Sequence, residues 1–272
     1  ILSSLVGSEM CIRDRGMSEV QKIRLLQITD LHFGKTPQCL VNHVNPVMTF
    51  NAILDDIDRL RWHKDIIILS GDLSGIESYK SYKILNKILK YRDKKIIWLP
   101  GNHDNITDMI KYLKDFPRII SMALQNWSVI TLDTSQPNSP VGYIHADELQ
   151  MLERQLVKMK DKFIIIAMHH CPALVGSRWL DKHRVKNHSD FFRILSNHKN
   201  IKGIFTGHVH QKFEGICKDI AVYTTPSSCF QFEPNSQKYE ISETLPGYRW
   251  LHLFDDGTLE TGVNYVSAKL TG

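Results

Sequence analysis

Five short apolar segments of this chain each end in polar residues that can bind a metal ion or transfer a proton. Short runs rich in β-branched and aromatic residues are typical of strands buried on both faces. The segments are Leu25–Thr29, Ile66–Ser70, Ile96–Leu99, Phe163–Met168 and Gly203–Thr206. The polar residues that follow them are Asp30 and His32, then Asp72, then Asn102, His103 and Asp104, then His169 and His170, and finally His208 and His210. Because ligands of open α/β sheets bind at the carboxyl ends of the strands, we expect these side chains to share one edge of a sheet.

None of these motifs is specific by itself. The stretch Gly101-Asn102-His103-Asp104, taken alone, is as consistent with an Asx turn and a hydrogen-bonded histidine as with a functional loop. The recurrence of the pattern at five strand ends favours a functional site, because only 13 histidines are distributed over the 272 residues.

Strands and helices alternate along most of the chain. Apolar residues at helical spacing predict helices within residues 46–60, 76–89, 106–116, 147–159 and 191–195, and residues 127–132 are expected to form a further strand. Beyond His210 the pattern changes to short strands, expected over Ile216–Thr225, Cys229–Phe232, Gly247–Leu253 and Leu259–Val266. This order predicts an α/β fold in which two packed mixed sheets are flanked by helices.

The composition narrows the class of partner. Hydrophobic residues make up 42% of the chain, enough for the core of a single domain, which we expect over residues 17–272. The formal charge of +5 suits a small anionic substrate and is too small to indicate a nucleic-acid-binding surface, so we expect no nucleic-acid partner. Five cysteines without a CxxC pair indicate a reducing compartment, and we expect the cytoplasm. No apolar run approaches the ~20 residues of a membrane span, and either a monomer or a homodimer is compatible with the sequence.

The first sixteen residues stand apart from this pattern. They lack the basic start of a signal peptide, and the run from Ser8 to Arg15 resembles a translated sequencing adapter. We therefore expect residues 1–16 to be a non-native extension and Met17 to be the natural start.

Seven of the strand-end residues are candidate metal ligands: Asp30, His32, Asp72, Asn102, His169, His208 and His210. Imidazole and carboxylate groups without thiolates suit Fe, Mn or Zn better than Ca or Mg. Seven donors exceed the need of one ion and suit two divalent ions about 3.5–4 Å apart that share a carboxylate. On extended segments, the two side chains of Asp-x-His and of His-x-His lie on one face. Of the adjacent pair we select His169 as the ligand and expect His170 to be packed beside it.

Two ions at this spacing suggest hydrolysis of a phosphate ester. They lower the pKa of a bridging water to about 7 and neutralise charge on a phosphoryl group, so a bridging hydroxide is the expected nucleophile. The leaving alkoxide still needs a proton, and His103, directly after Asn102, is placed to supply it as a general acid. Asp104 is expected to orient the His103 imidazole, as a carboxylate behind a histidine does.

Together the five motifs resemble those of the calcineurin-like metallophosphoesterases, in that family's order along the chain. The segments Ser177–His183, Thr225–Phe232 and Pro246–Arg249 extend the similarity to the bacterial class III 3′,5′-cyclic AMP phosphodiesterases. The resemblance implies a four-layer α/β/β/α sandwich, a dinuclear centre of the iron or manganese type, and hydrolysis of cyclic AMP to 5′-AMP.

The resemblance also assigns the ligands and the substrate contacts. One ion would take Asp30, His32, Asp72 and His210, and the other would take Asp72, Asn102, His169 and His208, with Asp72 shared. The nucleotide phosphate would be lined by His32, Asp72, Asn102, His103 and His210. Cys171 stands where many members carry proline or histidine, a departure that affects the surroundings of the ligands and not the ligand set.

Two other functions stay open. The first is a phosphoesterase of broader specificity, acting on nucleotides or nucleic-acid ends. The second is a non-catalytic scaffold that keeps this fold for protein binding; the complete ligand set disfavours it, because a scaffold could lose ligands freely. The loop Cys171–Asn187 carries Arg178 and His183, which either contact substrate or form part of the solvated surface.

Overall fold

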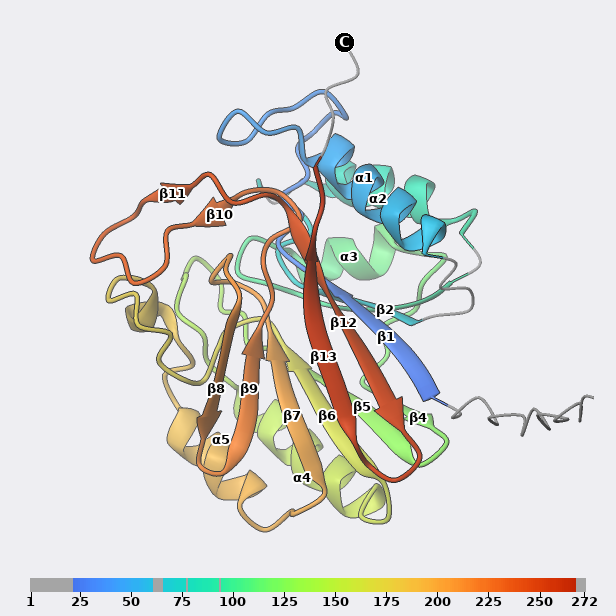
Figure 1. Ribbon diagram of the computed structural model, residues 1–272, viewed down its shortest axis with the longest axis vertical. Helices are drawn as coiled ribbons and strands as arrows, with labels where there is room; N and C mark the ends of the chain where they lie inside the picture. Colours follow the sequence, from blue (N-terminus) through green and yellow to red (C-terminus); the bar gives the residue numbers. More distant parts are fainter. Residues whose placement is uncertain (1–21, 61–65, 77, 93, 268–272) are drawn as a thin grey trace, which may run out of the picture.

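The computed structural model describes residues 22–60, 66–76, 78–92 and 94–267. The expected non-native extension over residues 1–16 lies outside these described residues. Two β-sheets pack face to face, and helices cover their outer sides (Figure 1). The predicted four-layer α/β/β/α sandwich is therefore confirmed. Within the described part of the chain, no helix combines the length and apolar character needed to span a membrane.

The first sheet has five strands in the order β13-β12-β1-β2-β3. Strands β1, β2 and β3 are parallel, while β12 pairs antiparallel with both β1 and β13. The strands are β1 (Lys22–Ile28), β2 (Ile66–Ser70), β3 (Lys95–Leu99), β12 (Gly247–Phe254) and β13 (Leu259–Tyr265). Strand β12, late in the chain, thus returns to pair with β1.

The second sheet has six strands in the order β4-β5-β6-β7-β9-β8. The four inner strands are parallel, and β4 and β8 form antiparallel edges. The strands are β4 (Ser121–Leu124), β5 (Trp127–Leu132), β6 (Phe163–Met168), β7 (Ile201–Thr206), β8 (Phe213–Cys217) and β9 (Ile220–Thr224). A two-stranded ribbon, β10 (Gln231–Phe232) with β11 (Ile241–Ser242), lies between β9 and β12 in the chain.

The helices divide between the two outer faces. Helices α1 (Pro46–Arg59), α2 (Tyr79–Leu89) and α3 (Ile106–Tyr112) lie on the side of β1 and β2, and α4 (Ala146–Lys158) and α5 (His188–Leu195) lie on the other side (Figure 1). A short 3-10 helix, η1 (Leu180–His183), interrupts the long loop after β6. Pro46 opens α1, and the Asn45 side chain accepts hydrogen bonds from the backbone of its first turn.

Successive side chains of a buried strand point to opposite faces, so each sheet contributes side chains to two hydrophobic cores. In β2, Ile66 and Ile68 face the opposite sheet, whereas Ile67 and Leu69 face the helices. In β6, Ile165 belongs to the core between the sheets, while its neighbours pack against α4 and α5. Because successive side chains point to opposite faces, a strand covered on both sides is apolar at most positions, and polar residues concentrate where it ends.

One strand expectation is wrong. Residues Ile216–Thr225 do not form one continuous strand but belong to a hairpin of β8 and β9. Lys218 and Asp219 make its turn with φ angles of 50° and 65°, the left-handed pair that suits the twist of a two-residue hairpin. The glycine or asparagine that usually signals such a turn is absent, and the edge strand β4 was likewise not predicted.

Candidate metal centre

The strand-end side chains converge between the two sheets and not along one sheet as expected. The loops after β1, β2 and β3 approach the loops after β6 and β7, which belong to the other sheet. Nε2 of His169 lies 3.3 Å from Oδ2 of Asp72, and Nε2 of His210 lies 3.2 Å from Oδ1 of Asp30. The single shared edge was wrong because each sheet supplies only part of the set.

A left-handed backbone directs these side chains, and the extended conformation expected for the Asp-x-His and His-x-His segments is not found. The φ angles of Asp30, His32, Asp72, His208 and His210 are 53°, 52°, 51°, 67° and 47°. Non-glycine residues in unusual backbone regions cost of order 1–3 kcal/mol each and gather at functional sites. Two backbone hydrogen bonds hold the turns together, from the Asp30 amide to the Gly71 carbonyl and from the His32 amide to the Asp72 carbonyl.

The first half of the centre comprises Asp30, His32 and His210. The Nε2 atoms of His32 and His210 are 3.0 Å apart, and Nε2 of His32 is 4.0 Å from Oδ2 of Asp72. Two donors that each lie about 2.1 Å from one ion, at right angles, are about 3.0 Å from each other. The spacing therefore fits donors that share an ion, and all three residues offer their ligand atoms within 4.8 Å of one another.

The second half is marked by buried polar atoms that make no hydrogen bond, although Nε2 of His169 faces the Asp72 carboxylate. Oδ1 of Asn102 and the Nε2 atoms of His169 and His208 are buried and make no hydrogen bond. An unsatisfied buried polar group costs about 1–3 kcal/mol, and such groups call for an explanation by an ion, a water or a function. An amide oxygen and two imidazole nitrogens, one of them 3.3 Å from the Asp72 carboxylate, fit a divalent cation.

Two histidines are held so that their Nε2 atoms keep a lone pair. Nδ1 of His169 is 2.8 Å from the Ser70 carbonyl oxygen, and Nδ1 of His210 is 2.7 Å from the Phe230 carbonyl oxygen. A carbonyl can only accept, so in each ring the proton belongs to Nδ1 and the neutral form offers Nε2 to a metal.

Opposite charges in the centre shift the ionisation of its members. Burial alone would raise the pKa of the Asp72 and Asp30 carboxyls, but the adjacent histidines, His169 above all for Asp72 and His210 for Asp30, hold both below the usual value. Burial would lower the pKa of His169, but the two carboxylates outweigh it and raise this pKa to about 10. Burial and then His210 lower the pKa of His32 to about 3. In the metal-free protein, protonated His169 thus supplies the positive charge that balances the two carboxylates.

His103 and Asp104 have different roles from each other. The His103 ring is exposed, its centroid is 5.3 Å from that of His32, and its backbone amide donates to Oδ1 of Asp72. Among the hydrogen bonds of the described residues, none joins the Asp104 carboxylate to the His103 ring. The expectation that Asp104 orients this imidazole is therefore corrected.

The Asp104 carboxylate instead holds the backbone of two loops. It accepts hydrogen bonds from the amides of Gly101, Leu73 and Ser74 at 3.0–3.1 Å, and from the Tyr82 hydroxyl at 2.9 Å. Its burial, followed by the nearby charge of Asp72, raises its pKa to about 6 despite these donors. Sequence reasoning missed Tyr82, because helical spacing identifies it only as a core position of α2.

Aromatic side chains and a cavity border the centre on different sides. Phe232 stacks on the His210 ring at a centroid distance of 4.4 Å, and Trp179 packs edge-on against Phe232. The loop that carries Trp179 also brings the His183 ring to 5.9 Å from that of His208, whereas Arg178 is exposed. A polar cavity of about 420 Å³ opens beside Asn102, between the loop that leads into α3, the start of that helix and the loop 133–138. A larger cavity of about 750 Å³, beside α5 and β8, is lined by none of the seven candidate ligands.

Comparison with protein families gives a clear match. A family model described as calcineurin-like phosphoesterase matches residues 23–212. A 3′,5′-cyclic-nucleotide phosphodiesterase of Nostoc is 31% identical and covers 93% of this chain and 96% of its own. The 3′,5′-cyclic adenosine monophosphate phosphodiesterase CpdA of Vibrio vulnificus is 34% identical over 90% of this chain and 91% of its own. The CpdA of Escherichia coli K12 is 30% identical over 90% of both chains.

Solved structures share the fold at low sequence identity. A dimetal phosphatase from Danio rerio superposes with a TM-score of 0.65 at 12% identity, over 90% of this chain and 99% of the other. GAP50 of Plasmodium, described as the anchor in the inner membrane complex, superposes with a TM-score of 0.62 at 16% identity, over 92% and 86% of the two chains. Since a phosphatase and an anchor both have this fold, the fold alone does not decide between catalysis and scaffolding.

Proposed function

The chain belongs to the calcineurin-like phosphoesterase family, and on that premise we propose that it hydrolyses the 3′ ester of 3′,5′-cyclic AMP to give 5′-AMP. Three relatives that cover nine tenths or more of the chain are named as 3′,5′-cyclic nucleotide or cyclic AMP phosphodiesterases. Membership of this family makes the chain a metal-dependent phosphodiesterase. The proposal concerns its substrate, cyclic AMP.

The convergence of seven donors into two adjoining sets is the observation that supports this proposal. We assign Asp30, His32, Asp72 and His210 to the first ion position, and Asp72, Asn102, His169 and His208 to the second. Asp72 suits the shared place because its Oδ2 lies 3.3 Å from Nε2 of His169 and 4.0 Å from Nε2 of His32. The donor chemistry suits iron or manganese, with zinc as a further candidate.

The metal ions and the protein contribute different parts of the reaction. The two donor sets would hold two divalent ions, which would supply a hydroxide nucleophile near neutral pH and would neutralise phosphoryl charge. The protein orients the phosphate with His32, Asp72, Asn102, His103 and His210. The exposed His103 imidazole protonates the leaving 3′ oxygen, and Asp104 keeps the loops of Asp72 and Asn102 in place. The polar cavity beside Asn102 offers room for part of the nucleoside.

A substrate panel tests this function. Purified protein loaded with Mn²⁺ is assayed on 3′,5′-cyclic AMP, on 2′,3′-cyclic AMP and on bis(p-nitrophenyl) phosphate. We expect the highest kcat/KM for 3′,5′-cyclic AMP and 5′-AMP as the only nucleotide product. The variant Asp72→Asn should lose turnover of all three, while His198→Asn, in the turn after α5, serves as the matched control and should retain it.

The same panel decides between the alternatives. If 3′,5′-cyclic AMP is the poorest of the three substrates, the chain is a phosphoesterase of broader specificity and the proposal fails. If none is hydrolysed although both ions bind, the chain acts as a scaffold. We further propose that residues 17–272 form one domain, because residues of both sheets, such as Leu25 and Ile165, share the core between them.

A further inference from the structure

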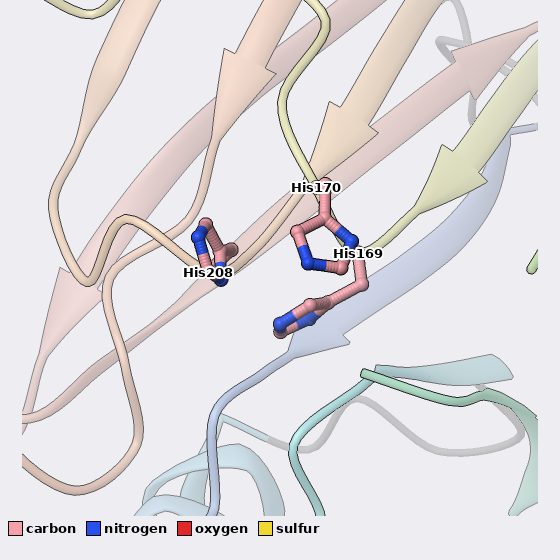
Figure 2. A group of neighbouring side chains, drawn as sticks. All are labelled: His169, His170 and His208. Atoms are coloured by element: carbon pink, nitrogen blue, oxygen red, sulfur yellow. The ribbon is translucent and has the colours of Figure 1, made fainter. Parts of the chain in front are cut away.

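A third imidazole stands beside the second ion position. The ring of His170 lies 4.9 Å from that of His169 and 4.5 Å from that of His208, between centroids. One ring nitrogen of each of the three residues lies within 4.8 Å of the other two. Figure 2 shows the three rings gathered around one space, with His169 and His170 coming from the loop after β6 and His208 from the loop after β7.

His170 has the same signature as the two histidines assigned to that position. It is fully buried, and its Nε2 atom makes no hydrogen bond, as is also true of Nε2 in His169 and His208. A histidine that merely fills the core normally pairs both ring nitrogens, because an unsatisfied buried nitrogen costs about 1–3 kcal/mol. The expectation that His170 is only packed beside His169 leaves this orphaned atom without an explanation.

Thr134 and Gly142 hold the His170 ring in one orientation. Nδ1 of His170 is 2.8 Å from Oγ1 of Thr134, which also accepts the backbone amide of His170 at 3.2 Å. The hydroxyl oxygen has two lone pairs, so it can accept both the backbone N–H and an Nδ1–H. Gly142 packs closely against the base of the ring, where an added Cβ atom would come within 2.6 Å of Cγ of His170.

From these observations we infer that His170 supplies a third imidazole to the second ion position, through Nε2, beside His169 and His208. The inference rests on the proposed dinuclear centre and adds a donor to it. Thr134 is then a positioning residue, because it keeps the Nδ1 proton in place as the Ser70 carbonyl does for His169. Nitrogen donors predominate in the resulting set, which suits Co²⁺, Fe²⁺ or Zn²⁺ better than Mn²⁺.

Metal titration of variants provides the first test. Metal-free wild type, His170→Asn, Thr134→Val and the control His198→Asn are titrated with Co²⁺, and binding is followed by visible absorption and by metal analysis. Mutation of a residue that hydrogen-bonds a metal ligand lowers metal affinity by about 10–100-fold. Thr134→Val should therefore lower the affinity for the second Co²⁺ by that factor, and His170→Asn should lower it at least as much. The first Co²⁺ should bind unchanged, and His198→Asn should match wild type.

A measurement on the wild type keeps the test independent of whether the variants fold. Each imidazole bound to Co²⁺ through Nε2 shows its Nδ1 proton as one strongly shifted, exchangeable signal in the proton NMR spectrum. We expect five such signals, from His32, His169, His170, His208 and His210. Four signals, or a His170→Asn variant that binds the second Co²⁺ as tightly as wild type, would overturn the inference.

The two proposals fail in different ways. If wild type binds two ions and hydrolyses 3′,5′-cyclic AMP while His170→Asn keeps full affinity, only the role of His170 is refuted. If wild type binds no metal at all, the dinuclear centre and the added donor are refuted together.

Discussion

At the scale of single residues, ordinary hydrogen bonds to the backbone prepare the side chains for metal binding. The carbonyls of Ser70 and Phe230 accept the Nδ1 protons of His169 and His210. A strand end thereby fixes both the orientation and the tautomer of a ring on a neighbouring element. Asp104 shows the same use of the backbone. Its carboxylate accepts hydrogen bonds from three amides and one phenol, so it fixes two loops and does not orient a histidine ring.

Removal of the His103 imidazole should separate catalysis from metal binding. We expect His103→Ala to keep both ions, because the exposed ring is outside the two donor sets, and to lower kcat by about 10²–10⁴-fold, as loss of a general acid does. Metal analysis and steady-state assays with 3′,5′-cyclic AMP measure the two effects. Unchanged kcat would exclude His103 as the proton donor.

Replacement of Asp104 should have the opposite pattern. Asp104→Asn removes a carboxylate oxygen that holds the amides of the Asp72 and Asn102 loops, so we expect metal affinity to fall by about 10–100-fold, as for other supports of metal ligands. Substrate KM at saturating metal should change little. Competition with a chelator measures the affinity, and Asp108→Asn in α3 is the matched control. Equal affinities of Asp104→Asn and the control would contradict this role.

At the scale of elements, close packing between strand ends brings the donors together. The loop after β7 passes directly against the end of β1, where the His208 amide donates to the Asp30 carboxylate at 3.0–3.2 Å. Gly207 allows this approach, because a Cβ atom there would overlap the Thr29 hydroxyl and come within 2.7 Å of Oδ2 of Asp30.

Alanine at Gly207 should therefore damage both stability and the centre. We expect Gly207→Ala to lower the free energy of unfolding by about 1–3 kcal/mol, as overpacking does, and to weaken metal binding through displacement of Asp30. Gly203→Ala in β7 is the matched control, because its nearest neighbours are ring atoms of Phe205 and Tyr223 at 3.1–3.2 Å. Denaturant unfolding compares the two variants, and equal midpoints would refute the steric role of Gly207.

At the scale of the whole molecule, the centre joins two sheets and so links metal binding to folding. Asp30 and Asp72 follow strands of one sheet, whereas His169 follows a strand of the other. Without metal, the proton on His169 serves as the cation between them. The pKa of this ring rises from 6.5 to about 10 in the folded protein, so the folded state binds the proton more tightly than the unfolded state does.

This proton predicts a distinctive pH dependence. The stabilisation is complete below pH 6.5 and is lost as the pH rises toward about 10, with a slope of at most about 1.4 kcal/mol per pH unit. Metal-free wild type should therefore lose free energy of unfolding over this range more steeply than metal-free His169→Gln. Saturating metal should reverse the contribution, because the ion binds the deprotonated ring. Denaturant unfolding across the range measures the slopes, and parallel slopes for the two metal-free proteins would refute the coupling.

The amino-acid sequence by itself determined most strands, most helices, the layered arrangement and the identity of the polar strand ends. These features follow from local patterns: a strand buried on both faces is mostly apolar until it ends, so Asp30, Asp72 and His169 stand out by position. The β8–β9 turn escaped prediction because Lys218 and Asp219 adopt left-handed angles without the residues that usually signal them.

Only the tertiary structure decided how the strand ends meet. His32 and His210 are 178 residues apart, yet their Nε2 atoms are 3.0 Å apart, a proximity that depends on the packing of one sheet on the other. The partners of Asp104 and the surroundings of the His170 ring likewise depend on contacts between segments that are distant in the sequence. Spacing along the chain cannot specify such contacts, because their energies arise between segments that the sequence alone does not place side by side.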